Sequence, residues 1–171
     1  MQQIVLAIFL AALWWRSNAF EHSDFIRPGL SELQVTFQGY QKASLGNELS
    51  PSAALSEPTL GWKADSNTLY TVIMVDPDAP SRKNPFLSDY LHWLVVNVRG
   101  NSVKNGDELA SYRGPAPPPG SGAHRYYLLL YKQRRPITMR KMKSRANFNT
   151  LKYARDNGLD GPVAGNYFKA Q

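Results

Sequence analysis

Three apolar runs rich in β-branched and aromatic residues constrain the fold more than any other feature of this chain. They span Leu69–Val75, His92–Val98 and Tyr126–Tyr131. Their composition is typical of strands that are buried on both faces. Pro- and Gly-rich connections separate them, and none contains an amphipathic helix of the length that a parallel crossover needs. The pattern therefore predicts an antiparallel sheet that contains all three runs.

Shorter elements are predicted around this sheet. Leu33–Phe37 alternates apolar and polar residues, as a half-buried strand does. Leu60–Trp62 is predicted to form another short strand, and Pro162–Phe168 returns to a strand-like pattern. We therefore expect a mainly β fold with several short edge strands.

One helix is predicted, over Asn147–Asn157. Asn147 or Asn149 can cap its start, and Gly158 is suited to the position just past its end. Its expected apolar face consists of Phe148, Leu151 and Ala154.

The size and composition indicate a single folded domain. The chain has 171 residues, of which 43% are hydrophobic and 19% charged. This length is sufficient to bury a core without covalent cross-links. The absence of cysteine excludes disulfides, thiolate metal sites and cysteine nucleophiles.

Residues 1–19 are predicted to be a signal peptide, which leaves residues 20–171 as one secreted domain. Ile4–Trp15 is uninterruptedly apolar but short for a membrane span. Ser17 and Ala19 are small residues at the positions that signal peptidase prefers. No Lys or Arg precedes the apolar stretch. A membrane-anchored N-terminus and a cytoplasmic chain with an apolar tail therefore stay open as alternatives.

The formal net charge is +7, and much of the excess lies in one segment. Such a run is usually a solvated loop, and it also suits peripheral contact with an anionic membrane. No stacking or helix-turn-helix pattern accompanies it, so nucleic acid is not an expected partner. Its basic residues are Lys132, Arg134, Arg135, Arg140, Lys141, Lys143 and Arg145.

Polar motifs border all three apolar runs. Asp76-Pro77-Asp78-Ala79-Pro80-Ser81-Arg82 follows the first, His92 opens the second, and Gly122-Ala123-His124-Arg125 precedes the third. If the strands lie side by side, two Asp and two His side chains meet at one rim. The two prolines of the first motif fix φ, so that motif is predicted to be a rigid turn.

Each of these residues also has a purely structural interpretation. Asp76 and Asp78 can cap the turn through hydrogen bonds to the backbone. A histidine inside a strand, such as His92, is often a satisfied core residue. Gly120–Gly122 offers backbone N–H groups to an anion, and Pro115–Pro119 is either a pocket wall or a surface linker.

Together these motifs resemble the phosphatidylethanolamine-binding protein family, whose signatures are Asp-Pro-Asp-Ala-Pro-Ser-Arg and Gly-x-His-Arg. The likeness extends from Leu33 to Phe168. Segments 89–95 and 147–150 are similar to the plant flowering-regulator branch, whereas Ser81-Arg82 and the leader are similar to the secreted, odorant-type animal branch. Other matching positions are Trp62, Leu94–Asn97 and Pro162–Gly165.

The resemblance implies a PEBP-like antiparallel β-sandwich, with a large sheet on a smaller one and one short helix near the C-terminus. It also implies a cavity that binds phosphate-bearing head groups. The implied ligand-binding residues are Asp76, His92, His124 and Tyr126 in the cavity, Asp78, Tyr90 and Pro118 at its edge, and Gly122 beside it.

The sequence departs from the animal branch in two respects. Many animal members continue into a C-terminal helix near the cavity, whereas this sequence ends at Gln171. Leu87 and Leu91 stand where animal members often carry aromatic and His residues. Both differences bear on ligand preference more than on the existence of a cavity.

The leading hypothesis is non-catalytic binding of a phosphatidylethanolamine-like head group, with no cofactor, catalytic residue or metal ligand. A carboxylate at Asp76 repels phosphate unless it holds a histidine in its charged form or receives the ammonium of ethanolamine. If the charge of His92 and His124 dominates, binding strengthens below about pH 6.5.

Two other classes stay open. Two His and two Asp are enough for a metal-dependent hydrolase, but no His-x-x-His spacing or Gly-x-Ser-x-Gly elbow occurs. A protein-interaction role, as a protease inhibitor or a signalling partner, is also compatible with the resemblance. The expected partners are thus a phospholipid or free head group and a protease or signalling protein, bound by a monomer.

Overall fold

The computed structural model describes residues 25–171, which contain a six-stranded and a two-stranded sheet. The predicted signal peptide of residues 1–19 lies outside the described residues. The large sheet has the order β1-β8-β7-β4-β5-β6, and all its neighbours are antiparallel except the parallel pair β1 and β8. Its strands are β1 (Ser31–Glu32), β4 (Leu69–Asp76), β5 (Tyr90–Arg99), β6 (Asp107–Ala110), β7 (His124–Gln133) and β8 (Leu159–Ala170).

Short elements complete the described chain. The small sheet pairs β2 (Gln34–Thr36) with β3 (Thr59–Gly61), in antiparallel orientation. The α-helix α2 covers Thr150–Asp156, and none of the described helices is long and apolar enough to cross a membrane. Three 3₁₀ turns are η2 (Gln38–Tyr40), η3 (Pro51–Ala54) and η4 (Val103–Asn105).

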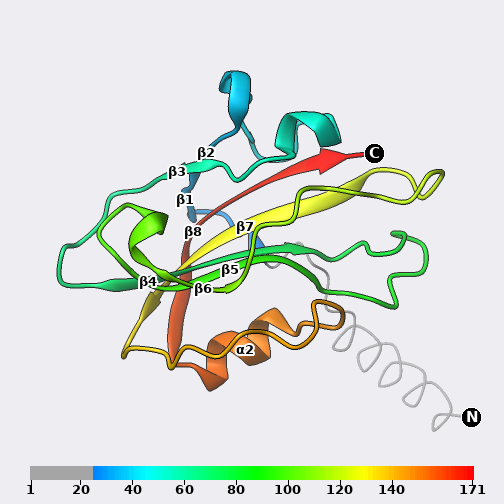
Figure 1. The fold of residues 1–171 in the computed structure, drawn as a ribbon. Coiled ribbons are helices and arrows are strands. Elements are labelled where there is room, and N and C mark those ends of the chain that lie inside the picture. The colour runs from blue at the N-terminus through cyan, green and yellow to red at the C-terminus, as the bar shows by residue number, and fades with distance from the viewer. Residues whose placement is uncertain (1–24) are drawn as a thin grey trace, which may run out of the picture.

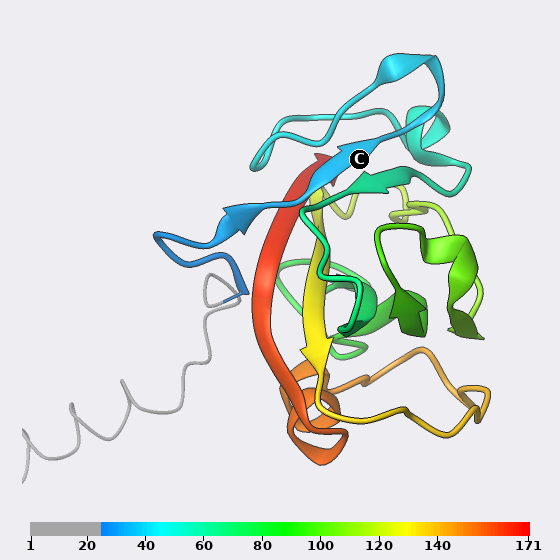
Figure 2. The same cartoon turned by 90° about the vertical axis from the view of Figure 1, so that its left-hand side faces the viewer.

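The large sheet has a hydrophobic layer on each face. The small sheet covers one face, and α2 lies on the other (Figures 1 and 2). Because side chains alternate along a strand, Val72 and Met74 of β4 join the layer under the small sheet, whereas Ile73 and Val75 join the layer on the helix side. This double burial explains why the central strands are apolar on both faces. The predicted mainly β sandwich with one short C-terminal helix is confirmed.

The central strands and β8 include and extend the predicted ones, whereas β2 is shorter than the predicted Leu33–Phe37 and β3 is shifted by one residue from the predicted Leu60–Trp62. β4, β5 and β7 each continue into the neighbouring polar motif, so Asp76, Tyr90 and His124 are strand residues. The edge strand β6 was not predicted, because its sequence Asp-Glu-Leu-Ala lacks the β-branched and aromatic residues typical of strands. Pairing with β5 forms this strand in spite of its local composition.

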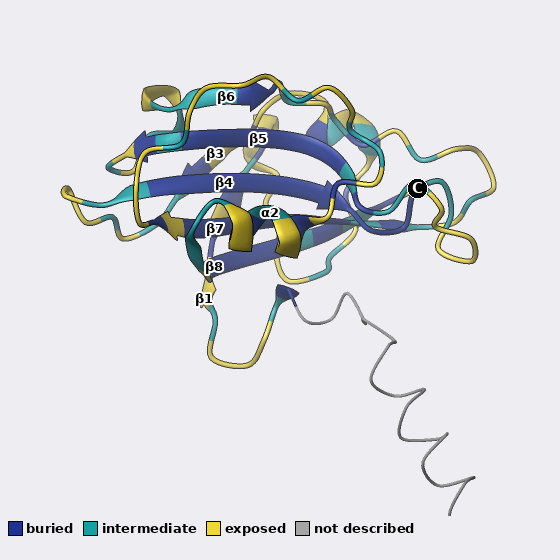
Figure 3. Ribbon diagram, turned by 90° about the horizontal axis from the view of Figure 1, so that it is seen from below, coloured by how far each residue is buried: buried dark blue, intermediate teal, exposed yellow. Residues whose placement is uncertain are grey.

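The predicted helix is shorter than expected. Asn149 is its N-cap, and the side-chain oxygen of this residue accepts a hydrogen bond from the N–H of Lys152 at 2.8 Å. Gly158 follows the helix with a positive φ of 64°, a conformation that glycine adopts easily. The predicted apolar face is wrong at Leu151, which is 37% exposed, while Ala154 is buried and Tyr153 packs on the core. Figure 3 shows α2 across the sheet with its outer side exposed.

Replacing Leu151 by glutamine is therefore expected to change the free energy of unfolding by no more than about 0.5 kcal/mol, as for other surface sites. Urea unfolding followed by circular dichroism measures this value. The variant Ala154→Gln, on the buried side of the same helix, is expected to cost about 1–3 kcal/mol because it overpacks the core. Equal losses for the two variants would contradict this orientation of α2.

Candidate functional site

The order of the strands brings the three polar motifs together. β4 lies between β5 and β7, and both neighbours run antiparallel to it. The end of β4 at Asp76 is therefore next to the start of β5, where Tyr90 is its register partner. His124 begins β7 at the same end of the sheet. Three segments that are distant in sequence thus meet at one edge of the sheet.

A cavity of about 240 Å³ lies at this edge. Six of the eight residues predicted to bind a ligand line it, whereas Asp78 and Gly122 do not. The lining also includes small and apolar residues from the turn after β4 and from the proline-rich segment, which forms part of the wall. The lining residues are Asp76, Ala79, Pro80, Leu87, Tyr90, His92, Arg113, Ala116, Pro118, His124 and Tyr126.

Asp76 and His124 form a buried pair. His124 Nδ1 lies 2.7 Å from Asp76 Oδ2, and the side chains are 1% and 4% exposed respectively. The N–H of Asp78 donates to Asp76 Oδ1 at 2.7 Å, so Asp76 also caps the turn. Burial raises the pKa of the Asp76 carboxyl and outweighs the hydrogen bonds from His124 and Asp78, which lower it. The second nitrogen of His124, Nε2, lies 3.0 Å from Ser121 Oγ.

His92 is also buried, but it bonds to the backbone instead of a carboxylate. Its Nδ1 lies 2.7 Å from the carbonyl oxygen of Arg113. A carbonyl only accepts, so Nδ1 carries the proton and Nε2 of the neutral ring is an acceptor. Burial, together with the charges of Arg145 and Arg113, lowers the pKa of His92 to about 4. The positive charge expected at His92 from the sequence is therefore not available near neutral pH.

Arg113 brings a permanent positive charge to the cavity. Its Nη1 donates to the Tyr90 hydroxyl at 2.5 Å, and its backbone N–H donates to the His92 carbonyl oxygen at 2.9 Å. Sequence analysis missed this residue, because it stands alone in a segment without regular structure. The only sequence signal is its place two residues before the proline-rich wall.

Arg145 holds the start of β5 in place through hydrogen bonds to its backbone. Its Nη1 donates to the carbonyl oxygens of Leu91 and His92 at 3.1 and 3.0 Å, and its Nη2 donates to the Ser111 carbonyl oxygen at 2.8 Å. It thereby joins β5 to the segment that carries Arg113. The basic run was predicted to be a solvated loop. Most of its residues are exposed, but Arg145 holds a wall of the cavity in place.

Asp78 contacts Arg125 instead of the cavity. Its two carboxylate oxygens accept three hydrogen bonds from this one residue, at 2.7, 2.8 and 2.9 Å. Burial raises the pKa of Asp78, but the bonds from Arg125 outweigh burial and hold that pKa below its usual value. The pair ties the turn after β4 to the start of β7.

These residues supply hydrogen-bonding groups but no metal-ligand cluster. Within residues 25–171, no three His, Asp or Glu side chains are grouped so that they could hold a metal ion. Burial and the nearby Asp76 raise the pKa of Tyr126, so its hydroxyl stays protonated. The cavity can therefore offer one permanent cation, the two phenol hydroxyls of Tyr90 and Tyr126, and two imidazoles of different environment to a small polar ligand.

Comparison with known families gives one match along nearly the whole chain. A sequence model described as phosphatidylethanolamine-binding protein matches residues 17–168. This range contains every residue of the cavity.

Relatives from animals and plants are similar over most of the chain. A Drosophila melanogaster protein provisionally named odorant-binding protein A5 is 38% identical over 81% of this chain and 70% of its own length. CEN-like protein 1 of Nicotiana tabacum is 40% identical over 86% and 84%. A 26 kDa secreted antigen of Toxocara canis is 35% identical over 81% of this chain and 56% of its own.

A solved structure shares the fold. A carboxypeptidase Y inhibitor, determined in complex with its cognate proteinase, superposes with a TM-score of 0.73 at 30% identity. The match covers 81% of this chain and 82% of the inhibitor.

Proposed function

Because this chain belongs to the phosphatidylethanolamine-binding protein family, we propose that it is a non-catalytic binding protein for phosphate-bearing head groups of the phosphatidylethanolamine type. The observation that carries the proposal is the convergence of Asp76, His92, His124 and Tyr126 on one cavity with Arg113. Its volume of about 240 Å³ is below the usual range for drug-sized ligands and suits a head group.

The charges of the cavity suggest how a zwitterionic head group binds. The phosphate is attracted by the Arg113 guanidinium and accepts a hydrogen bond from the Tyr126 hydroxyl. It also accepts one from His124 Nε2 when Asp76, bonded to Nδ1, holds the ring in its charged form. The Asp76 carboxylate accepts a hydrogen bond from His124, and this bond reduces the repulsion between Asp76 and the phosphate. The ammonium of ethanolamine donates to Nε2 of neutral His92.

Calorimetric titration with phosphorylethanolamine at pH 7 tests this proposal. His124→Ala and Arg113→Ala are each expected to weaken binding about tenfold, as for the loss of one charge-assisted hydrogen bond. Arg99→Ala removes an exposed positive charge at the far end of β5 and serves as the control with unchanged affinity. If neither cavity variant alters the affinity, the cavity is not the binding site.

The source of the head group is tested separately. Sedimentation with vesicles that contain phosphatidylethanolamine reports binding of the intact phospholipid, whereas calorimetry reports binding of the free head group. Binding in calorimetry but not to vesicles would assign the cavity to a soluble ligand and would exclude a role at the membrane surface.

A second candidate function is protease inhibition. It is favoured by the likeness to the carboxypeptidase Y inhibitor at 30% identity. An assay of carboxypeptidase Y activity with increasing amounts of this protein tests it directly. Undiminished activity at a large molar excess would remove this candidate for that class of protease.

We propose secretion as the location of the protein. The support is the leader-like N-terminal sequence together with the relative named as a secreted antigen. Expression with the complete N-terminus and sequencing of protein from the medium tests it, with Phe20 as the expected first residue. Retention of the whole chain inside the cell would contradict secretion.

A further inference from the structure

A second cavity, of about 590 Å³, lies on the opposite side of the large sheet from the first. One wall comes from α2 and its end, and another comes from the segment between β7 and α2. Tyr153 packs against the layer on the helix side of the sheet, whereas Tyr126 of the first cavity belongs to the layer under the small sheet. The lining residues are Leu109, Arg135, Pro136, Ile137, Thr138, Arg140, Met142, Tyr153 and Asn157.

Hydrogen bonds at two points hold the wall of this cavity against the sheet. Asn97 of β5 bonds to both backbone groups of Ile137, with its Nδ2 at 2.8 Å from the carbonyl oxygen and its Oδ1 at 2.8 Å from the N–H. The N–H of Met142 donates to the Leu109 carbonyl oxygen at 3.0 Å. The segment between Ile137 and Met142 is therefore held at both ends and forms one wall of the cavity.

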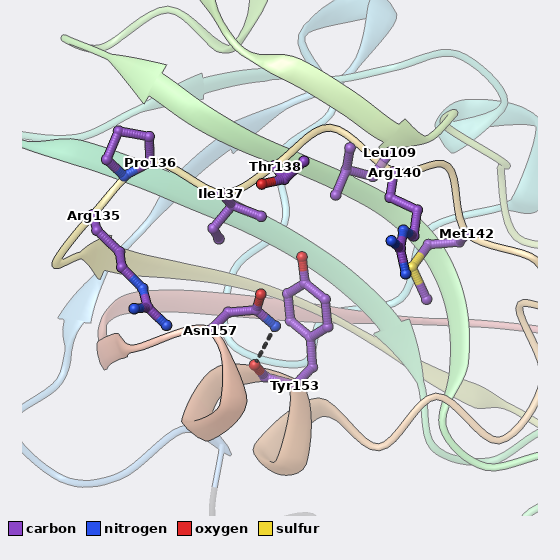
Figure 4. A pocket seen from close by; sticks show the side chains of 9 residues that line it. All are labelled: Leu109, Arg135, Pro136, Ile137, Thr138, Arg140, Met142, Tyr153 and Asn157. Carbon is purple, nitrogen blue, oxygen red and sulfur yellow. Dashed lines mark hydrogen bonds between the residues drawn. The ribbon is translucent and has the colours of Figure 1, made fainter.

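The charge of the lining is entirely positive. Arg135 and Arg140 contribute two guanidinium groups, and no Asp or Glu lines the cavity. Neither arginine side chain forms an ion pair or a side-chain hydrogen bond with any other residue in the part of the chain that the structure describes. Figure 4 shows them on two sides of the Tyr153 ring. Both charges are thus free to bind an anion.

The remaining lining is apolar, apart from a few hydrogen-bonding groups. The Tyr153 ring rises from α2 toward the facing segment, where Ile137, Leu109 and Met142 lie nearest to it and Pro136 lies farther along (Figure 4). The Tyr153 hydroxyl is buried and has no hydrogen-bond partner. Because an unpaired buried hydroxyl is unfavourable, an acceptor that reaches it past the lining side chains gains a strong interaction.

From these observations we propose that the cavity at α2 is a second ligand site, for a single-chain amphipathic anion. The head group, a carboxylate or a phosphate, binds one of the two arginines, Arg135 or Arg140, and accepts a hydrogen bond from the Tyr153 hydroxyl. The apolar chain lies against Ile137, Met142 and the Tyr153 ring. The volume is within the range of small-molecule sites. This site is independent of the head-group cavity, since the two share no lining residue.

Calorimetric titration with decanoate, decyl phosphate, decanol and decyltrimethylammonium tests the charge requirement. Both anions are expected to bind, whereas the neutral alcohol and the cation are not. A stronger response to one anion identifies the preferred head group. Absence of binding by both anions, or equal binding by all four compounds, would overturn the proposal.

A matched pair of variants tests the location. Arg135→Ala with Arg140→Ala is expected to weaken decanoate binding by about tenfold. Lys63→Ala with Arg99→Ala removes the same number of exposed positive charges elsewhere and should leave the affinity unchanged. Equal losses of affinity in the two double variants would show that the effect comes from net charge alone. That result would contradict a specific binding site at the α2 cavity.

Two further measurements test the location of the site without relying on variants that could be misfolded. Tyr153→Phe removes the unpaired hydroxyl, so its stability should be unchanged or higher while its affinity for decanoate falls. Amide chemical shifts on titration should change at residues 135–142 and 153–157. Changes confined to residues 90–92 and 124–126 would place the anion in the head-group cavity and overturn the proposal.

Discussion

Replacing Asp78 by alanine is expected to lower the free energy of unfolding by about 3–5 kcal/mol, because it removes one partner of a buried ion pair. The Asp78 side chain is 2% exposed, and its carboxylate accepts three hydrogen bonds from Arg125. Without it, the Arg125 guanidinium keeps its charge but loses the groups that replaced its water. The loss of unfolding free energy should be near the lower end of this range, since Arg125 is 17% exposed and regains part of its hydration.

A second Asp–Arg pair of the same chain is the matched control. Arg134 donates to Asp160 with similar geometry, at 2.6 to 3.0 Å, but the two side chains are 72% and 48% exposed. Exposed pairs contribute little to stability because water solvates both charges. Asp160→Ala should therefore leave the urea midpoint nearly unchanged, whereas Asp78→Ala should lower it clearly. Similar shifts in the two variants would falsify the structural role assigned to Asp78.

The role of Asp78 illustrates a limit of sequence analysis. The two carboxylates of the Asp-Pro-Asp motif are two residues apart and look equivalent in the sequence. In the structure, Asp76 lines the cavity and bonds His124, whereas Asp78 bonds Arg125. His124 and Arg125 are neighbours in a strand, so their side chains point to opposite faces. Only the pairing of β4 with β7 determines which carboxylate meets which partner.

The meeting of Asp76, His92 and His124 was predictable for a local reason. Each of these residues adjoins an apolar run with a strong strand pattern, and connections without a crossover helix favour antiparallel neighbours. In antiparallel strands, the end of one lies beside the start of the next. The site residues therefore reach the same edge as soon as the three strands are adjacent in the sheet.

Arg113 and Arg145 were not predictable in the same way. Neither belongs to a strand or a helix, so no periodicity places them. Their positions depend on hydrogen bonds to the backbone of His92, which is 21 and 53 residues away in the sequence. Such contacts depend on the tertiary structure, and the composition of a basic loop does not distinguish an anchoring arginine from a solvated one.

Acidification from pH 6.5 to pH 4 is expected to destabilise the protein through His92 by about 3 kcal/mol. The pKa of His92 is about 4 in the folded protein, against 6.5 for an unperturbed histidine. Over this interval the unfolded chain binds a proton at His92 and the folded chain does not. Unfolding is therefore favoured as the pH falls. Above pH 6.5 His92 is neutral in both states and does not destabilise the folded protein.

The variant His92→Asn isolates this contribution, because its amide can still donate to the Arg113 carbonyl oxygen but does not titrate. Other groups titrate in the wild type and in the variant alike. Asp76, with its raised pKa, acts in the opposite direction, since its proton is bound more tightly in the folded state. The difference in unfolding free energy between the two proteins, measured with urea from pH 4 to pH 7, should therefore change by about 3 kcal/mol in favour of the variant at low pH. Parallel stability curves would show that the pKa of His92 is the same in the folded and unfolded states. The ring would then carry a positive charge in the head-group cavity below about pH 6.5.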